Sequence, residues 1–304
     1  MQPIAMIAAA LAATATPLPA FAETHPTFSA EDATPDRFSV EVLGEGDEDV
    51  ILIPGLLSPR SVWEGQVDTL LASGARVHLV QVDGFGDTDP GKNAEGPVLP
   101  FLVSDIAKYI ETNGLGTARI VGHSMGGFTA LNLALDKPWL VEEIMIVDSL
   151  PFFSVLMGME TPEAAEGMAA GMRDMMVAQA SMDLPAPDCD APSMQAQSMA
   201  VTKAAQCKVD AYTASADLAV GGNLMYDIMT TDLRPRLAEL EVPVTMLYPI
   251  AEPLSAEMAA GIYPVQYEGT PDITFVPVEG ARHFIMLDQP DQMNAALLAF
   301  LADD

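Results

Sequence analysis

The chain is poor in basic residues, cysteine, histidine and tryptophan. Its 304 residues include 13 lysines and arginines against 43 acidic residues, which gives a formal net charge of −30. This balance argues against binding to nucleic acid or docking on anionic lipid, because both need clustered Lys and Arg. We interpret it as a hydrated acidic surface that aids solubility. Half of the residues are apolar and only 18% are charged, so we expect a globular protein rather than a disordered one.

The two cysteines limit the chemistry further. Neither Cys189 nor Cys207 lies beside a histidine, which argues against a thiol nucleophile or a zinc site. In an oxidising compartment a bridge between them would stabilise the chain by about 3 kcal/mol. We favour that bridge, and two free thiols are the alternative. No other cluster suggests a metal or an organic cofactor, so we expect none.

The first 22 residues contain no charged side chain. An apolar segment at 4–12 leads through two prolines to Ala20-Phe21-Ala22, which is typical of a secretory leader cleaved after Ala22. The missing Lys or Arg near Met1 leaves an uncleaved anchor as the alternative, although the apolar part is short for a membrane span. We therefore expect a periplasmic or secreted protein with no stable membrane association after cleavage.

Short β-branched runs alternate with helical windows after a polar tail at 23–37. Strands are expected at 37–43, 50–55, 75–82, 118–122, 142–148, 242–248 and 272–278. This alternation predicts an α/β fold, a mostly parallel central sheet flanked by helices. Residues 151–232 contain only helical windows. We therefore expect a core at 38–150 and 233–304, with a helical cap inserted after the strand that ends at Asp148.

Ser124 lies in the sequence Gly122-His123-Ser124-Met125-Gly126, between a buried strand and a helix. A serine in such a tight turn adopts a strained backbone, so the residues two before and two after it must be small. The amides and the positive dipole end of the following helix suit an oxyanion. The pattern predicts that Ser124 is a nucleophile, and a structural glycine turn is the alternative.

A serine nucleophile needs a base, and the chain has only four histidines. His25 lies in the tail, His78 lies in an earlier strand, and His123 is adjacent to Ser124 in the turn. His283 remains, in a loop between the last strand and the last helix. Elimination therefore predicts that His283 is the base.

The acid that orients the histidine has two candidates. Glu252 follows the strand at 242–248 and lies between the serine and the histidine in chain order. Asp148 ends the strand before the cap, and its alternative role is to cap a helix or bond a loop. We favour Glu252 and keep Asp148 as the rival.

These residues resemble the α/β-hydrolase superfamily over about 38–304. "GHSMGG" is similar to its nucleophile elbow, and the order Ser124, Glu252, His283 to its catalytic triad. "IPGLLSPRSVW" resembles its oxyanion loop, which implies an oxyanion hole formed by the amides of Leu56 and Met125. "VDGFGDTDPG" resembles its glycine-rich loop, and the insertion at 151–232 matches its variable lid.

The chain departs from the family pattern at three positions. Pro54 replaces the usual histidine of the oxyanion loop, Glu252 replaces the commoner aspartate, and Pro249 stands where glycine is frequent. The oxyanion loop is therefore braced differently, and the acid is the least secure member of the triad.

The resemblance implies a serine hydrolase that forms an acyl-enzyme. We expect a carboxylic-ester hydrolase, lactones included (EC 3.1.1), acting on a small to medium apolar substrate. The same triad also serves C–C bond hydrolases, amidases or peptidases, and cofactor-free perhydrolases. A catalytically inactive binding protein of the same fold is the alternative from a different class.

The cap is expected to shape the substrate pocket. It holds more than half of the chain's 19 methionines, and methionine provides an adaptable apolar lining. Phe152, Phe153 and Met157 are the candidate wall residues. The alternative, which we favour for the methionines as a set, is that they only pack the cap helices together.

Overall fold

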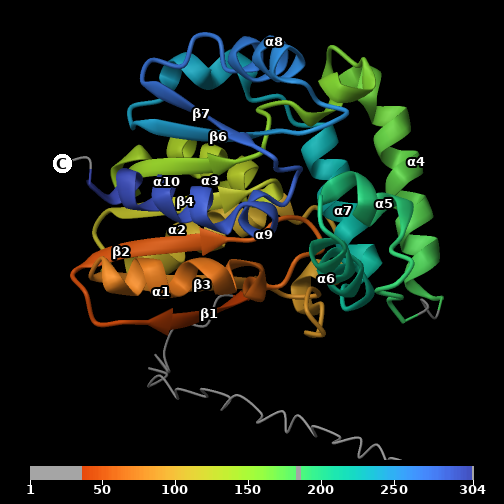
Figure 1. The fold of residues 1–304 in the computed structure, drawn as a ribbon, viewed down its shortest axis with the longest axis horizontal. Coiled ribbons are helices and arrows are strands. Elements are labelled where there is room, and N and C mark those ends of the chain that lie inside the picture. The colour runs from red at the N-terminus through yellow and green to blue at the C-terminus, as the bar shows by residue number, and fades with distance from the viewer. Residues whose placement is uncertain (1–35, 183–185, 303–304) are drawn as a thin grey trace, which may run out of the picture.

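The computed structural model describes residues 36–182 and 186–302, which form a seven-stranded sheet with helices on both faces (Figure 1). The strand order is β1-β3-β2-β4-β5-β6-β7. β1 pairs with β3 antiparallel, and all other neighbours are parallel. The strands are β1 (Phe38–Leu43), β2 (Glu48–Ile53), β3 (Ala75–Val82), β4 (Ala118–His123), β5 (Val141–Val147), β6 (Val244–Ile250) and β7 (Ile273–Glu279). The predicted fold class is confirmed.

Burial along the strands explains their sequences. Every residue of β4 is buried, as is every residue of β2 after Glu48. Central parallel strands are covered on both faces and therefore read as continuous apolar runs. β1 lies at the edge of the sheet; its sequence alternates apolar and polar residues from Phe38 to Val42, and most of its positions are partly exposed. The continuous apolar runs thus belong to the strands at the centre of the sheet.

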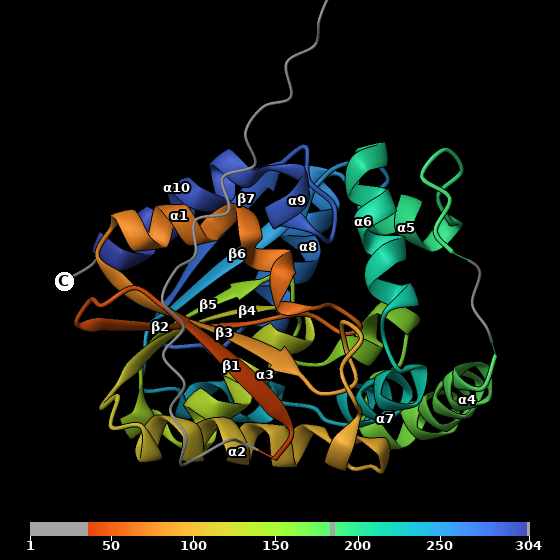
Figure 2. The ribbon, with the colours of Figure 1, turned by 90° about the horizontal axis from the view of Figure 1, so that it is seen from below.

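Helices cover the two faces of the sheet and form two separate apolar cores. Helices α2 and α3 lie on one face, and α1 and α10 lie on the other (Figure 2). The longer core helices are α1 (Glu64–Ala72), α2 (Leu99–Thr112), α3 (Met125–Asp136), α8 (Ala256–Gln266) and α10 (Pro290–Ala302); α9 (Ile285–Asp288) is a single turn. Short 3-10 helices are η1 (Arg60–Trp63), η2 (Gly91–Ala94), η3 (Pro138–Leu140), η4 (Phe153–Met157) and η5 (Arg234–Glu239).

Between β5 and β6 the chain leaves the sheet and forms a group of helices beyond the carboxyl ends of the parallel strands (Figures 1 and 2). These helices are α4 (Pro162–Ala180), α5 (Met194–Met199), α6 (Lys203–Ala214) and α7 (Leu218–Met229). In open α/β sheets this end is where ligands bind. We refer to residues 151–232 as the cap.

One cap helix is tied firmly to the core. The Asp227 carboxylate of α7 accepts hydrogen bonds from the amides of Val98 and Leu99, at 2.7 and 2.9 Å, where α2 begins. Burial raises the pKa of Asp227 above its ordinary value, and the two amides oppose that shift. These bonds satisfy two of the amides that the first turn of a helix leaves unpaired. The cap therefore supplies part of the N-terminal capping of a core helix.

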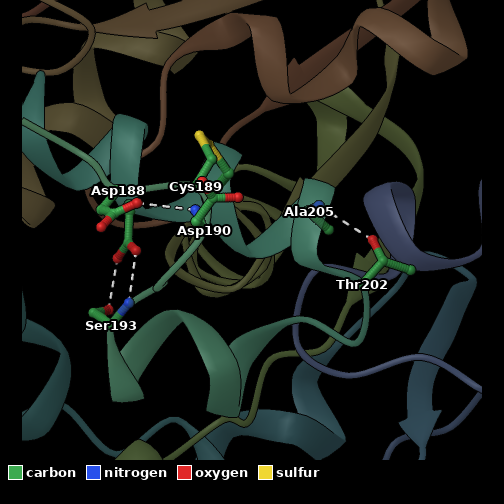
Figure 3. Close-up of a disulfide and its surroundings, with 8 residues drawn as sticks. Asp188, Cys189, Asp190, Ser193, Thr202 and Ala205 are labelled. Carbon is green, nitrogen blue, oxygen red and sulfur yellow. Dashed lines mark hydrogen bonds between the residues drawn. A yellow bond between two sulfur atoms is a disulfide. The ribbon is translucent and has the colours of Figure 1, made fainter.

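A disulfide links two segments of the cap (Figure 3). It joins Cys189 to Cys207 of α6, whose Cα atoms are 4.8 Å apart. Nearby, Ser193 bonds the Asp210 carboxylate through both its amide and its hydroxyl. The cross-link thus connects the segment before α5 to α6.

The expected leader at 1–22 lies outside the described residues, as does the tail at 23–37 except for its last two positions. No helix in the described part of the chain combines the length and apolar character needed to cross a membrane.

Candidate active site

Ser124 lies in the turn between β4 and α3, with φ +52° and ψ −115°. Non-glycine residues rarely adopt this region. A Cβ atom at Gly122 would come within 2.2 Å of the Gly126 carbonyl oxygen, and one at Gly126 within 2.2 Å of the Ile53 carbonyl oxygen. Glycine is therefore required on both sides of the serine. The turn places Ser124 in the wall of a pocket at the carboxyl end of the sheet.

The two residues expected to supply oxyanion amides flank this serine. Met125 begins α3, and Leu56 follows β2 in the loop beside the turn; both line the pocket that contains Ser124. Within the described chain, neither backbone amide donates a hydrogen bond to a protein group. The positive end of the α3 dipole also lies here. Both amides thus remain available to a ligand.

His283 lies between β7 and α9 and lines the same pocket. Its Nδ1 donates a hydrogen bond to Asp148 Oδ2 at 2.7 Å. Because the carboxylate accepts at Nδ1, a neutral His283 has its lone pair on Nε2, which is the arrangement of a general base. The structure records no hydrogen bond between Ser124 and His283. It brings both residues, together with Asp148, to one cavity.

The prediction that Glu252 is the partner of His283 is wrong, because the structure places Asp148 there instead. The Glu252 side chain is exposed and does not line the pocket. Its backbone carbonyl accepts hydrogen bonds from the Arg282 guanidinium at 2.9 and 3.2 Å. A tight turn closes after β6, in which the Leu254 amide donates to the Ala251 carbonyl at 2.8 Å. That turn directs Leu254, rather than Glu252, into the pocket.

Asp148 occupies the position beside His283 through an unusual backbone conformation. Its φ is +47°, and its amide donates to the Leu247 carbonyl of the neighbouring strand at 2.9 Å. Only 11% of its side chain is exposed. The carboxylate that bonds His283 therefore comes from the end of β5, whereas the sequence analysis favoured one after β6.

A tyrosine that the sequence analysis did not identify contacts the same carboxylate. The hydroxyl of Tyr263, on α8, donates to Asp148 Oδ1, and its ring lines the pocket. Tyr267, one helical turn later, donates to the Ser149 carbonyl at 3.0 Å. The spacing of four between the two tyrosines puts both on one face of a helix, and this is the only signal in the sequence.

His123 supports the loop that carries His283. Its Nε2 donates to the His283 backbone carbonyl at 2.9 Å, and the two ring centroids are 4.6 Å apart. The residue is fully buried, and burial followed by the neighbouring His283 places the pKa of His123 well below its ordinary value. It is therefore neutral. The opposite ring atom, Nδ1, faces Gly55 of the oxyanion loop, where a Cβ atom would come within 2.6 Å.

The pocket is a cavity of about 230 Å³. Apart from Ser124, Asp148, Ser149, Tyr263 and His283, its walls are apolar. The cap provides Phe153, Leu156, Met225 and Ile228, and the core provides Leu56, Met125, Phe128, Leu150, Leu254 and Ile262. The volume lies below the range of about 300–1,000 Å³ that is usual for ligand sites.

Of the three candidate wall residues of the cap, one lines the pocket and two do not. Phe153 lines the pocket, whereas Phe152 is fully buried beneath the Arg234 guanidinium, 4.6 Å from its ring centroid. Met157 does not line the pocket, whereas its neighbour Leu156 does, with 55% of the residue still exposed. Met225 is the one cap methionine among the described lining residues. Met229 is fully buried, whereas Met168, Met175, Met182 and Met194 are exposed, so packing accounts for only part of the methionine content of the cap.

Residues 36–182 and 186–302 contain no group of three or more His, Cys, Asp or Glu side chains placed to hold a metal ion.

Comparison with known proteins agrees with this geometry. Residues 50–290 match the sequence model of the alpha/beta hydrolase fold family. The pimeloyl-[acyl-carrier protein] methyl ester esterase of Pectobacterium atrosepticum is 26% identical over 260 residues, which is 84% of this chain and 95% of that enzyme.

Two further likenesses extend the comparison. The enzyme of the same name from Aeromonas hydrophila is 34% identical over 138 residues, which cover 45% of this chain and about half, 51%, of that relative. Among solved structures, the enol-lactonase from Burkholderia xenovorans LB400 has a TM-score of 0.66 at 18% identity, covering 88% of this chain and 96% of that one. This last likeness concerns the fold.

Proposed function

Because the chain belongs to the alpha/beta hydrolase fold family and is a hydrolase of esterase type, we propose that it cleaves carboxylic esters or lactones through an acyl-enzyme on Ser124. This proposal rests on the observation that three residues of a catalytic triad line one cavity. Ser124 in its strained turn, His283, and Asp148 at 2.7 Å from His283 Nδ1 all line the pocket.

The reaction divides into acylation and deacylation. His283 Nε2 takes the hydroxyl proton as Ser124 attacks the ester carbonyl, and Asp148 stabilises the imidazolium that forms. The amides of Leu56 and Met125 bind the oxyanion of the tetrahedral intermediate. His283 then protonates the leaving alcohol. In the second half, His283 deprotonates a water molecule that releases the acid and regenerates the serine.

The pocket indicates the class of acyl group. The described residues that line it include no lysine or arginine, and the polar ones among them are the triad, Ser149 and Tyr263. A carboxylate-bearing acyl group would find no cation to pair with and would have to be desolvated. A cavity of about 230 Å³ suits short to medium neutral acyl groups.

The test is hydrolysis of p-nitrophenyl esters from acetate to dodecanoate, by the wild type and by Ser124→Ala. We expect the substitution to lower the rate by about 10³-fold or more, and a fluorophosphonate to label only the wild type. A wild type that is labelled but does not turn over esters would shift the reaction to amide, peptide, C–C bond or peroxide chemistry. A wild type that ignores both reagents would indicate a binding protein.

We further propose that the protein functions in the periplasm or outside the cell. The bridge between Cys189 and Cys207 supports this location, because disulfides persist in oxidising compartments. Mass spectrometry of the secreted protein should find a mature chain that begins at Glu23. A full-length chain retained in the cytoplasm would contradict this location.

A further inference from the structure

The Asp148 carboxylate receives hydrogen bonds from two side chains among the described residues, one at each oxygen. His283 Nδ1 donates to Oδ2 at 2.7 Å, and the Tyr263 hydroxyl donates to Oδ1. Among the described residues, these two side chains are the hydrogen-bond donors to this carboxylate. A carboxylate held at one oxygen alone rotates about its Cβ–Cγ bond, whereas donors at both oxygens fix its plane.

The Tyr263 hydroxyl is itself held in place. Only 6% of the residue is exposed, and its ring stacks on that of Tyr248, with centroids 4.9 Å apart and planes at 21°. Tyr267, the residue that follows α8, donates a hydrogen bond to the carbonyl of Ser149, next to Asp148. The two tyrosines therefore bond the successive residues Asp148 and Ser149, which follow β5.

The hydroxyl also keeps its proton. Burial first, and then the neighbouring Asp148 carboxylate, raise the pKa of Tyr263 far above its ordinary value of 10. The group therefore acts as a donor throughout the pH range in which a hydrolase is assayed.

We propose that Tyr263 is a positioning residue of the hydrolase: its hydroxyl fixes Asp148 Oδ1 so that Oδ2 faces His283 Nδ1. The inference rests on the proposed function, because it assigns Tyr263 a role in the same triad. Helix α8, which follows β6, thus contributes the Tyr263 phenol that holds Asp148 in position. The catalytic acid itself comes from the end of β5.

A second effect follows from the donated hydrogen bond. The phenol withdraws negative charge from the carboxylate, so its removal leaves Asp148 a stronger partner for a protonated His283. Among the described residues, His123 at the end of β4 faces His283, and Tyr267, just past the end of α8, lies near Asp148. Both are retained when Tyr263 alone is changed. The acidic limb of the pH profile should therefore move to higher pH in Tyr263→Phe.

The test compares Tyr263→Phe with Tyr248→Phe. The control loses the hydroxyl of the stacked ring, which bonds no described residue. We expect Tyr263→Phe to lower kcat for p-nitrophenyl butyrate by about 10- to 100-fold, with KM within about twofold, and to shift the acidic limb of kcat. Tyr248→Phe should retain kcat, KM and the pH profile of the wild type.

A second measurement separates this inference from the proposed function. The imidazole NMR signals of His283, identified by their loss in His283→Gln, report its Nδ1–H bond without any substrate. We expect the Nδ1 proton to resonate elsewhere and exchange faster in Tyr263→Phe but not in Tyr248→Phe. Such a change in a protein inert to esters would overturn only the proposed reaction. An unchanged Nδ1 signal and pH profile in Tyr263→Phe would overturn the positioning role, as would a loss of kcat explained entirely by a lower folded fraction.

Discussion

The loops that follow β5 and β6 start from adjacent parallel strands, and each carries one carboxylate just past its strand. Asp148 leaves β5 with φ +47°, and its side chain turns to His283. Glu252 leaves β6 in a tight turn that exposes its side chain and directs Leu254 into the pocket. The first loop supplies chemistry, and the second supplies shape; helix α8, which follows the second loop, supplies support through Tyr263.

The difference shows that proximity to a strand end does not decide which carboxylate serves the histidine. Both strands deliver their last residues to the same edge of the sheet. The direction of each side chain is set one or two residues later, by the backbone of the turn. In this protein that turn favours the aspartate of β5.

The largest expected effect tests which loop carries the acid. Asp148→Asn keeps the shape of the side chain but removes its charge, so His283 loses both its partner and its preferred tautomer. We expect kcat for p-nitrophenyl esters to fall by about 10³- to 10⁴-fold, with Glu252→Gln as the matched control within about twofold of the wild type. The reverse result, in which Glu252→Gln is the inactive variant, would return the acid to the β6 loop.

A smaller effect is expected from the wall that the β6 loop contributes. Leu254→Ala enlarges the pocket without touching the triad, so longer acyl chains should fit better. The ratio of kcat/KM for octanoate to that for acetate should rise by about 10-fold. Fluorophosphonate labelling of Ser124 should proceed at the wild-type rate. A fall in labelling with no change in chain-length preference would show that this loop acts on the chemistry instead.

The smallest effect concerns the support beneath His283, which neither loop supplies. His123 is fully buried and its pKa lies well below 6.5. Below pH 6.5, therefore, His123 binds a proton in the unfolded chain but remains neutral in the folded chain. The free energy of unfolding should consequently fall as the pH decreases, by up to about 1.4 kcal/mol per pH unit for this residue.

Urea unfolding of the wild type and of His123→Gln between pH 7 and pH 5 measures this contribution. The variant should be less stable at pH 7 but lose less stability on acidification. His78, whose pKa burial also lowers, is present in both proteins and contributes equally. Identical slopes in the two proteins would mean that His123 is charged in the fold.

The sequence by itself determined the sheet, its flanking helices, and the positions of Ser124 and His283. Continuous apolar runs, helical spacing and glycines are local features, and a turn as tight as that at Gly122 and Gly126 admits few alternatives. The histidine followed by elimination among four. None of these steps needs to know which residues meet across the fold.

Only the tertiary structure decided between Asp148 and Glu252, selected Leu156 and Leu254 for the pocket wall, and brought Tyr263 to the acid. Each of these depends on where a side chain points in the folded chain, which neither apolar periodicity nor residue spacing determines. Contacts between segments more than a hundred residues apart, such as Asp148 with Tyr263 and His283, leave no periodic trace in the sequence. They exist because the sheet brings the carboxyl ends of its strands to one edge.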